Sequence, residues 1–140
     1  MSFSFDTNVI SEVRKKERCD PAVARWWAGV DPDRIYLSPL LFGEIRRGIE
    51  QVRPRDPAQA QALERWLDAL ADGFRERILP VDRPVAEEWG RMNALRTFPA
   101  IHGLLAATAN VYDLTLVTRD VGDLAGCGGW LLDPFAAASV

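Results

Sequence analysis

Histidine and cysteine are scarce in this chain of 140 residues, which has one histidine and two cysteines. Cys19 and Cys127 stand far apart, with no CxxC pair and no second histidine, so the spacings typical of zinc ligands are missing. The same count gives no disulfide framework. We expect both cysteines to be reduced thiols.

Long apolar runs and an excess of positive charge are missing as well. The N-terminus has neither a basic region nor a long apolar stretch, which predicts no signal peptide, no membrane span and a cytoplasmic location. A net charge of -3 argues against a broad basic surface for nucleic acid. Basic residues do cluster locally, either as a solvated helix face or as a patch that binds a nucleic-acid backbone. They are Arg14, Lys15, Lys16, Arg46 and Arg47.

What the chain does contain is a regular alternation of strand-like and helical segments. With 48% hydrophobic residues and no linker, residues 1–140 are expected to form one domain. Strands are predicted at 3–5, 34–38, 76–82, 114–118 and 129–133, and helices at 6–16, 20–29, 39–52, 58–74, 83–95 and 101–112. This order predicts an α/β fold with a mainly parallel sheet, whose sites lie beyond the carboxyl ends of the strands.

Acidic residues fall at those strand ends. Asp6 follows the first predicted strand, and Asp120 follows the strand at 114–118, with Asp123 one turn further on. Glu44 lies on the apolar stripe of its helix, where an unpaired carboxylate is costly to bury. Taken singly, these acids are explained as helix caps, a loop acid and a residue at the edge of the stripe. Taken together, they indicate an oxygen-ligand site for Mg²⁺ or Mn²⁺ and hydrolysis of a phosphate ester.

His102 lies in the first turn of the helix predicted at 101–112. A polar residue in that position caps the helix, faces solvent or projects into a site at the helix N-terminus. The helical pattern leaves these three possibilities open.

Four segments together resemble PIN-domain ribonucleases, and more closely the VapC toxins of bacterial toxin–antitoxin pairs. The segments are DTNVIS at 6–11, GEIRRGIE at 43–50, HGLLAATA at 102–109 and LTLVTRD at 114–120. They follow the family order over nearly the whole chain. The resemblance implies a single PIN domain, an α/β/α sandwich with a central mainly parallel sheet, and cleavage of RNA with Mg²⁺ or Mn²⁺.

The resemblance also implies roles for individual residues. Asp6 and Glu44 match the first two acids of the family site, Asp120 matches the position that completes it, and Asp123 matches a further acid found in many members. Thr7, Asn8, Thr118 and Arg119 match residues that hold the acids or the scissile phosphate. In this pattern Asp6 and the third acid hold the metal, while Glu44 and Asp120 position the attacking water or bind a second ion.

His102 is where the chain departs from the family, which has a metal-ligand aspartate at this position. Neutral imidazole brings no negative charge and prefers softer ions than Mg²⁺. Three interpretations remain: an engineered or selected change that disables a toxic nuclease, a natural departure that retains Mn²⁺ through the imidazole, or a histidine without a metal role. We therefore expect this chain to be an impaired ribonuclease.

The partners implied by the resemblance are an RNA substrate and a VapB-like antitoxin. Family members form homodimers and larger toxin–antitoxin assemblies that contact DNA only through the antitoxin, and no membrane is involved. An alternative is a catalytically inactive protein that acts through antitoxin binding and promoter autoregulation. A phospho-acceptor enzyme is disfavoured, because position 8 is Asn8 rather than a second aspartate and no lysine follows a late strand.

Overall fold

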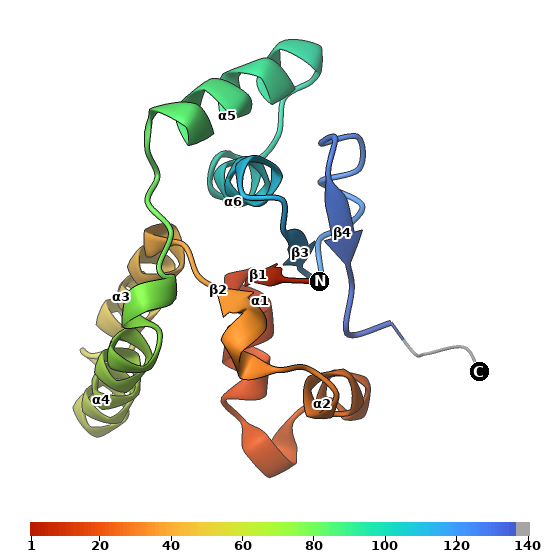
Figure 1. Ribbon diagram of the computed structural model, residues 1–140. Helices are drawn as coiled ribbons and strands as arrows, with labels where there is room; N and C mark the ends of the chain where they lie inside the picture. The colour runs from red at the N-terminus through yellow and green to blue at the C-terminus, as the bar shows by residue number, and fades with distance from the viewer. Residues whose placement is uncertain (137–140) are drawn as a thin grey trace.

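The centre of the fold is a four-stranded sheet, seen in a computed structural model that describes residues 1–136 (Figure 1). The strands are β1 (Phe3–Phe5), β2 (Ile35–Tyr36), β3 (Thr115–Val117) and β4 (Trp130–Leu132). Their order is β2-β1-β3-β4, and each neighbouring pair is parallel. β1 therefore lies inside the sheet, beside β3, which comes more than 100 residues later in the chain.

Helices occupy most of the rest of the described chain. They are α1 (Thr7–Val13), α2 (Pro21–Ala28), α3 (Pro39–Val52), α4 (Pro57–Gly73), α5 (Arg83–Leu95) and α6 (Ala100–Val111). Side-chain oxygens cap two of these helices at their N-termini: the Ser38 hydroxyl accepts from the N–H of Leu40 at 3.2 Å, and Asp82 accepts from the N–H of Val85 at 3.3 Å. Pro39 occupies the start of α3, where its missing N–H leaves no intrahelical bond unmade.

The strand predicted at 76–82 is wrong as an extended strand. Only an isolated parallel bridge between Leu37 and Ile78 forms there. A 3-10 turn occupies Arg75–Arg77, just before the bridge. Pro80, which has no N–H to donate to a neighbouring strand, lies two residues after Ile78. The remaining four predicted strands form, each within two residues of its expected bounds.

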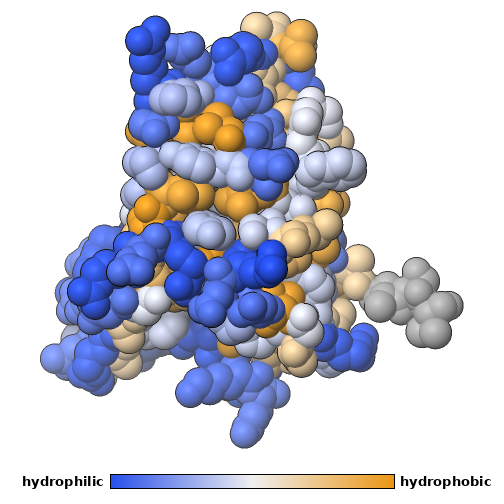
Figure 2. Space-filling view, in the orientation of Figure 1, coloured by the Kyte–Doolittle hydropathy of each residue, from blue (hydrophilic) through white to orange (hydrophobic). Residues whose placement is uncertain are grey.

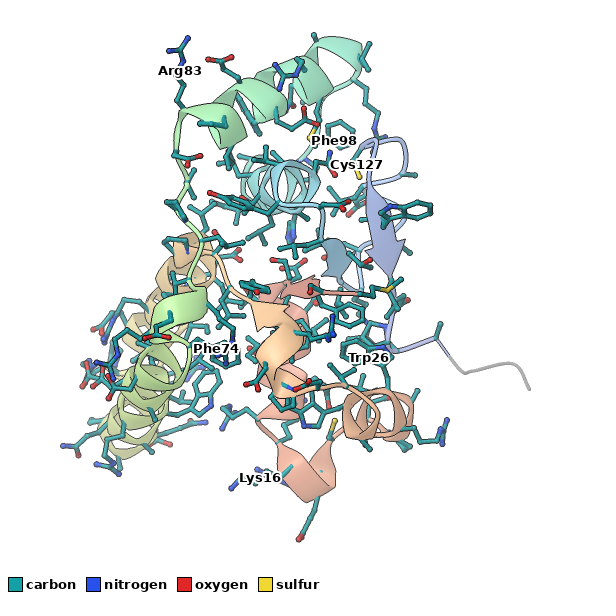
Figure 3. The ribbon with its side chains drawn as sticks, viewed as in Figure 1. Lys16, Trp26, Phe74, Arg83, Phe98 and Cys127 are labelled. Carbon is teal, nitrogen blue, oxygen red and sulfur yellow. The ribbon has the colours of Figure 1, made fainter. Side chains whose placement is uncertain are left out.

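Helices cover both faces of the sheet, as predicted for an α/β/α sandwich. Successive strand residues point to opposite faces, so Val117 joins a core with α1, α3 and α4, while Leu116 joins one with α5 and α6. Figure 3 shows Trp26 on the first side, and Phe98 and Cys127 on the other. Both cysteines are free thiols, as expected.

Asn110 near the end of α6 fixes the loop that leads into β4. Its side-chain amide donates to the carbonyl of Cys127 at 2.9 Å and to Glu88 at 3.0 Å. The backbone of Gly129 passes so closely that a Cβ there would lie 1.9 Å from Oδ1 of Asn110. Glycine at this position is therefore required by close approach.

None of the helices within residues 1–136 is long and apolar enough to span a bilayer.

Candidate functional site

Asp6 is the buried centre of the candidate site. It follows β1 directly, and its N–H donates to the carbonyl of Val117 at 2.9 Å, which holds it at the carboxyl edge of the sheet. Its side chain has no exposed surface. Oδ1 caps α1 by accepting from the N–H of Thr7 at 2.7 Å, and Oδ2 accepts from the Thr118 hydroxyl at 2.7 Å. The ordinary role as a helix cap and the role in a site are thus combined in one carboxylate.

Thr118 links Asp6 to Asp120. The hydroxyl that donates to Asp6 also accepts from the N–H of Asp120 at 3.0 Å. Asn8 donates from Nδ2 to Oδ2 of Asp120 at 3.1 Å, and the side chain of Asp120 remains 34% exposed. The site therefore has one inaccessible carboxylate and one that solvent or a ligand can reach.

His102 projects from the first turn of α6 into this group. Its Nδ1 donates to Oδ2 of Asp6 at 2.8 Å, and its Nε2 lies 3.8 Å from Oδ2 of Asp120. The hydrogen bond to Asp6 raises the pKa of His102 to about 9, aided by the negative charges of Asp6, Asp120 and Glu44 and opposed by partial burial. At neutral pH the ring is an imidazolium between two carboxylates. Of the three possibilities left open by the sequence, projection into a site is the one the structure supports.

Glu44 is held close to the site through Thr7. The Thr7 hydroxyl donates to Oε1 of Glu44 at 2.5 Å, while the N–H of the same residue donates to Asp6. Glu44 nevertheless lies outside the set of ligand atoms within 4.8 Å of one another, which comes from Asp6, His102 and Asp120. Two acids and the histidine converge, and the second predicted acid is attached to them indirectly.

Asp123 and Arg119 lie at the margin of the site. Asp123 is exposed and outside the convergent set, and its backbone carbonyl accepts a hydrogen bond from Arg96. Arg119 donates its N–H to Oδ1 of Asn8 at 3.4 Å, and its guanidinium stacks over the Phe135 ring at 4.1 Å. Sequence reasoning missed Phe135, because nothing in the local pattern at 133–136 indicates an arginine partner.

The convergent donor atoms fit a divalent cation that accepts both nitrogen and oxygen. Donors on one such ion lie roughly 3 to 4 Å apart, because each metal–ligand bond is about 2.0 to 2.2 Å. Asp6, His102 and Asp120 each offer one donor atom, and these three atoms lie within 4.8 Å of one another, slightly beyond this range. The 2.8 Å contact to Asp6 and the 3.8 Å contact to Asp120 are made by different ring nitrogens, so one ion can use only one of them. Mg²⁺ prefers oxygen alone, whereas Mn²⁺ and later transition ions accept imidazole more readily. The donor set therefore suits Mn²⁺ better than Mg²⁺.

Comparison with known proteins finds relatives over most of the chain. The model of the PIN domain matches residues 4–123. The toxin FitB of Neisseria gonorrhoeae is 32% identical over 122 residues, covering 84% of this chain and 86% of that protein. The VapC ribonuclease Y4jK of Sinorhizobium fredii is 29% identical over 138 residues, covering 95% and 97%.

Solved structures give the same relationship. The crystal structure of FitAcB from Neisseria gonorrhoeae superposes with a TM-score of 0.86 at 28% identity, over 96% of this chain and 99% of that one. The structure of FitAB bound to an IR36 DNA fragment gives a TM-score of 0.84 at 27% identity, over 95% of each chain. Since the family model covers nearly all of the strands and helices described above, the chain belongs to the PIN-domain family.

Proposed function

We propose that this chain is a metal-dependent endoribonuclease toxin of the VapC type whose activity is impaired by His102. The observation that carries the proposal is the convergence of Asp6, Asp120 and His102 at the carboxyl edge of the sheet, with Glu44 attached through Thr7. Relatives named as a toxin and as a ribonuclease support the reaction class. The substrate is RNA, and the cofactor is Mg²⁺ or Mn²⁺.

The proposed roles follow from burial and position. Asp6 and Asp120 hold the cation, with His102 in the third ligand position. Glu44 accepts a proton from the attacking water or orients it, because its carboxylate lies beside the group rather than within it. When bound, the cation makes water more acidic and neutralises charge on the scissile phosphate.

Other residues position these groups. Thr118 and Asn8 hold Asp120, and Thr7 holds both Asp6 and Glu44. Arg119 lies close enough in sequence to Asp120 to approach the phosphate, although its guanidinium also stacks on Phe135. Asp123 is proposed only as an outer carboxylate, since it lies outside the convergent set.

Impairment follows from charge. Replacement of a carboxylate by imidazole removes one negative charge from the ligand set, and the protonated ring places a positive charge where a cation is to be attracted. His102 would therefore have to lose its proton before its imidazole could serve as a ligand. Mg²⁺ is affected most because it gains little from a nitrogen ligand.

The test is cleavage of a single-stranded RNA by the purified chain and by its His102→Asp variant, each with Mg²⁺ and with Mn²⁺. We expect His102→Asp to raise the Mg²⁺-dependent rate by at least about a hundredfold, which corresponds to about 2.7 kcal/mol of barrier. Asp6→Asn in the His102→Asp background supplies a disabled control. Equal rates with and without the substitution would refute the impairment, and no cleavage by either protein would refute the ribonuclease assignment.

A second candidate function is antitoxin binding and promoter autoregulation without catalysis. It is favoured by the same ion pair between His102 and Asp6, which satisfies the acids without a metal, and by the toxin–antitoxin complexes among similar structures. On this proposal a VapB-like antitoxin covers the site, carries any DNA contact, and assembles with a homodimer of this chain in the cytoplasm. Co-purification with a partner encoded beside it supports this role, whereas a monomer that binds no such partner counts against it.

A further inference from the structure

Most of the basic residues that the sequence offered as RNA contacts already have protein partners. Arg46 pairs with Glu64 at 2.5 Å and with Glu50 at 3.3 Å. The surface over α3 and α4 is largely hydrophilic in Figure 2. Arg14 stacks over the ring of Trp66, and Lys15 pairs with Glu12 at 3.0 Å. Lys15 and Arg46 are thus partly neutralised before any ligand arrives, and Arg14 is held against an aromatic ring.

Among residues 1–136, neither Arg47 nor Lys16 has an ion-pair partner, and of these two Arg47 lies on α3 beside the candidate site. No carboxylate of residues 1–136 lies within ion-pair distance of its exposed guanidinium. It lies on α3 three residues after Glu44, so the two side chains share one face of the helix. A free cation thus lies one helical turn from a carboxylate of the candidate site.

Arg47 and Glu44 both line a pocket of about 330 Å³ between α3 and the start of α6. Its other lining residues are Pro39, Leu40, Gly43 and Ile101. Ile101 immediately precedes His102, and Glu44 is hydrogen-bonded through Thr7 to the group around Asp6. The pocket therefore opens beside the proposed cleavage site.

The lining suits a nucleotide. Leucine, isoleucine and proline side chains offer apolar contact to the face of a base, and a guanidinium is suited to bidentate binding of phosphate. From this juxtaposition we infer that the pocket is a subsite for the RNA nucleotide next to the scissile phosphate, with Arg47 as its phosphate ligand. The inference rests on the proposed function and assigns the path of the substrate across the protein.

A second pocket provides an internal control. It is about 320 Å³, lies on the other side of Glu44, and is lined by residues that include Arg14, Gly48 and Trp66. Gly43 and Gly48 belong to the same helix, and a Cβ on either would meet nothing within 4 Å. Because leucine favours helix more than glycine does, Gly43→Leu and Gly48→Leu each fill one pocket while retaining α3.

The experiment measures binding of a fluorescein-labelled single-stranded RNA hexamer by fluorescence anisotropy over a range of salt concentrations. The chain with His102 is used throughout, because its low expected activity permits binding without turnover. Arg47→Gln is compared with Arg46→Gln, and Gly43→Leu with Gly48→Leu. Circular dichroism of each variant confirms the helix content.

We expect Arg47→Gln to weaken binding about tenfold and to lower the salt slope by about 0.7, as for loss of one phosphate contact. Arg47→Lys restores the slope. Gly43→Leu weakens binding with the salt slope unchanged, and it has no effect on an abasic hexamer. Arg46→Gln and Gly48→Leu should each bind RNA with an affinity within about twofold of the unsubstituted chain. Arg46→Gln removes a cation that is already paired, and Gly48→Leu fills the second pocket rather than the proposed subsite.

Three outcomes overturn the inference. RNA binding that is equal in all variants, or lost only in Gly48→Leu, places the RNA elsewhere and leaves the ribonuclease proposal intact. If Arg47→Gln and Gly43→Leu each weaken the binding of poly(glutamate) as much as the binding of RNA, the pocket is a general anion or peptide site. No RNA binding by the unsubstituted chain removes the proposed function and this subsite together.

Discussion

Nδ1 of His102 and Oδ2 of Asp6 lie 2.8 Å apart, so the single histidine of the chain is hydrogen-bonded to a fully buried carboxylate. The other ring nitrogen lies 3.8 Å from Asp120. One side chain thereby faces the two acids that a cation would bridge. The behaviour of this ring with pH and with metal is the most direct measure of what the site does.

The protonation of His102 can be observed without interference, because no other histidine is present. In metal-free protein we expect its Cε1–H resonance to titrate with a midpoint at about pH 9. The Asp6→Asn variant removes the negative partner and should return the midpoint toward 6.5. A midpoint near 6.5 in the unsubstituted protein would mean that the ion pair does not form in solution.

The free energy of unfolding should also depend on the protonation of His102. The folded-state pKa of His102 is raised above the unfolded value of 6.5, so the ion pair with Asp6 stabilises the fold fully below pH 6.5. That contribution is lost as the pH rises through about 9. We expect the free energy of unfolding in urea with EDTA to fall between these values, and the fall to be smaller in His102→Gln. An equal fall in both proteins would assign it to another group.

Metal preference should shift toward Mg²⁺ when the aspartate is restored. His102→Asp adds a negative oxygen ligand, so we expect Mg²⁺ affinity at pH 7.5 to rise about ten- to a hundredfold by isothermal titration calorimetry. Mn²⁺ affinity should rise less, because the imidazole that is lost is itself a ligand for this ion. Asp123→Asn, outside the convergent set, should leave both affinities unchanged. A constant ratio of the two affinities would show that His102 is not a ligand.

Thr118 should matter for stability as well as for placement of the acids. Thr118→Val keeps the shape but removes the donor to Asp6 and the acceptor for the N–H of Asp120, both in a largely buried position. We expect a loss of about 1–3 kcal/mol in the free energy of unfolding. Thr118→Ser retains the hydroxyl and should lose less than half as much. Equal losses would indicate packing of the methyl group rather than the hydrogen bonds.

Gly129 tests the loop before β4. Gly129→Ala places a Cβ against Asn110, so either the loop or the amide must move, and we expect a loss of about 1–3 kcal/mol. Gly122→Ala in the same loop meets nothing within 4 Å and should change stability by less than about 0.5 kcal/mol. Thermal unfolding of the two variants side by side makes the comparison. Equal melting temperatures would show that the close approach relaxes without cost.

The helices and the positions of the acids were predictable because they depend on local chemistry. Ser38 and Asp82 have side-chain oxygens that cap a helix, so they indicate where a helix begins. The alternation of strand and helix segments places Asp6 and Asp120 at the same edge of a parallel sheet. The strand at 76–82 was not predictable in the same way. Its apolar residues fit a strand, but pairing ended at one bridge, because Pro80 and the preceding 3-10 turn interrupt the ladder.

The orientation of side chains within the site depends on contacts between distant segments. The family resemblance placed His102 at a ligand position, but its hydrogen bond to Asp6 joins residues 96 positions apart. The attachment of Glu44 through Thr7 and the stacking of Arg119 on Phe135 are of the same kind. Arg46 looked like an RNA contact in sequence, and only the packing of α4 on α3 brings Glu64 to it.

The central position of β1 also sets when the site can exist during synthesis. Chains emerge from the ribosome N-terminus first, and β1 can pair with β2 early, but its other edge waits for residues 115–117. A nuclease with this topology cannot act on the messenger or the ribosome that is producing it until the segment that carries β3 and Asp120 has been made and has paired with β1.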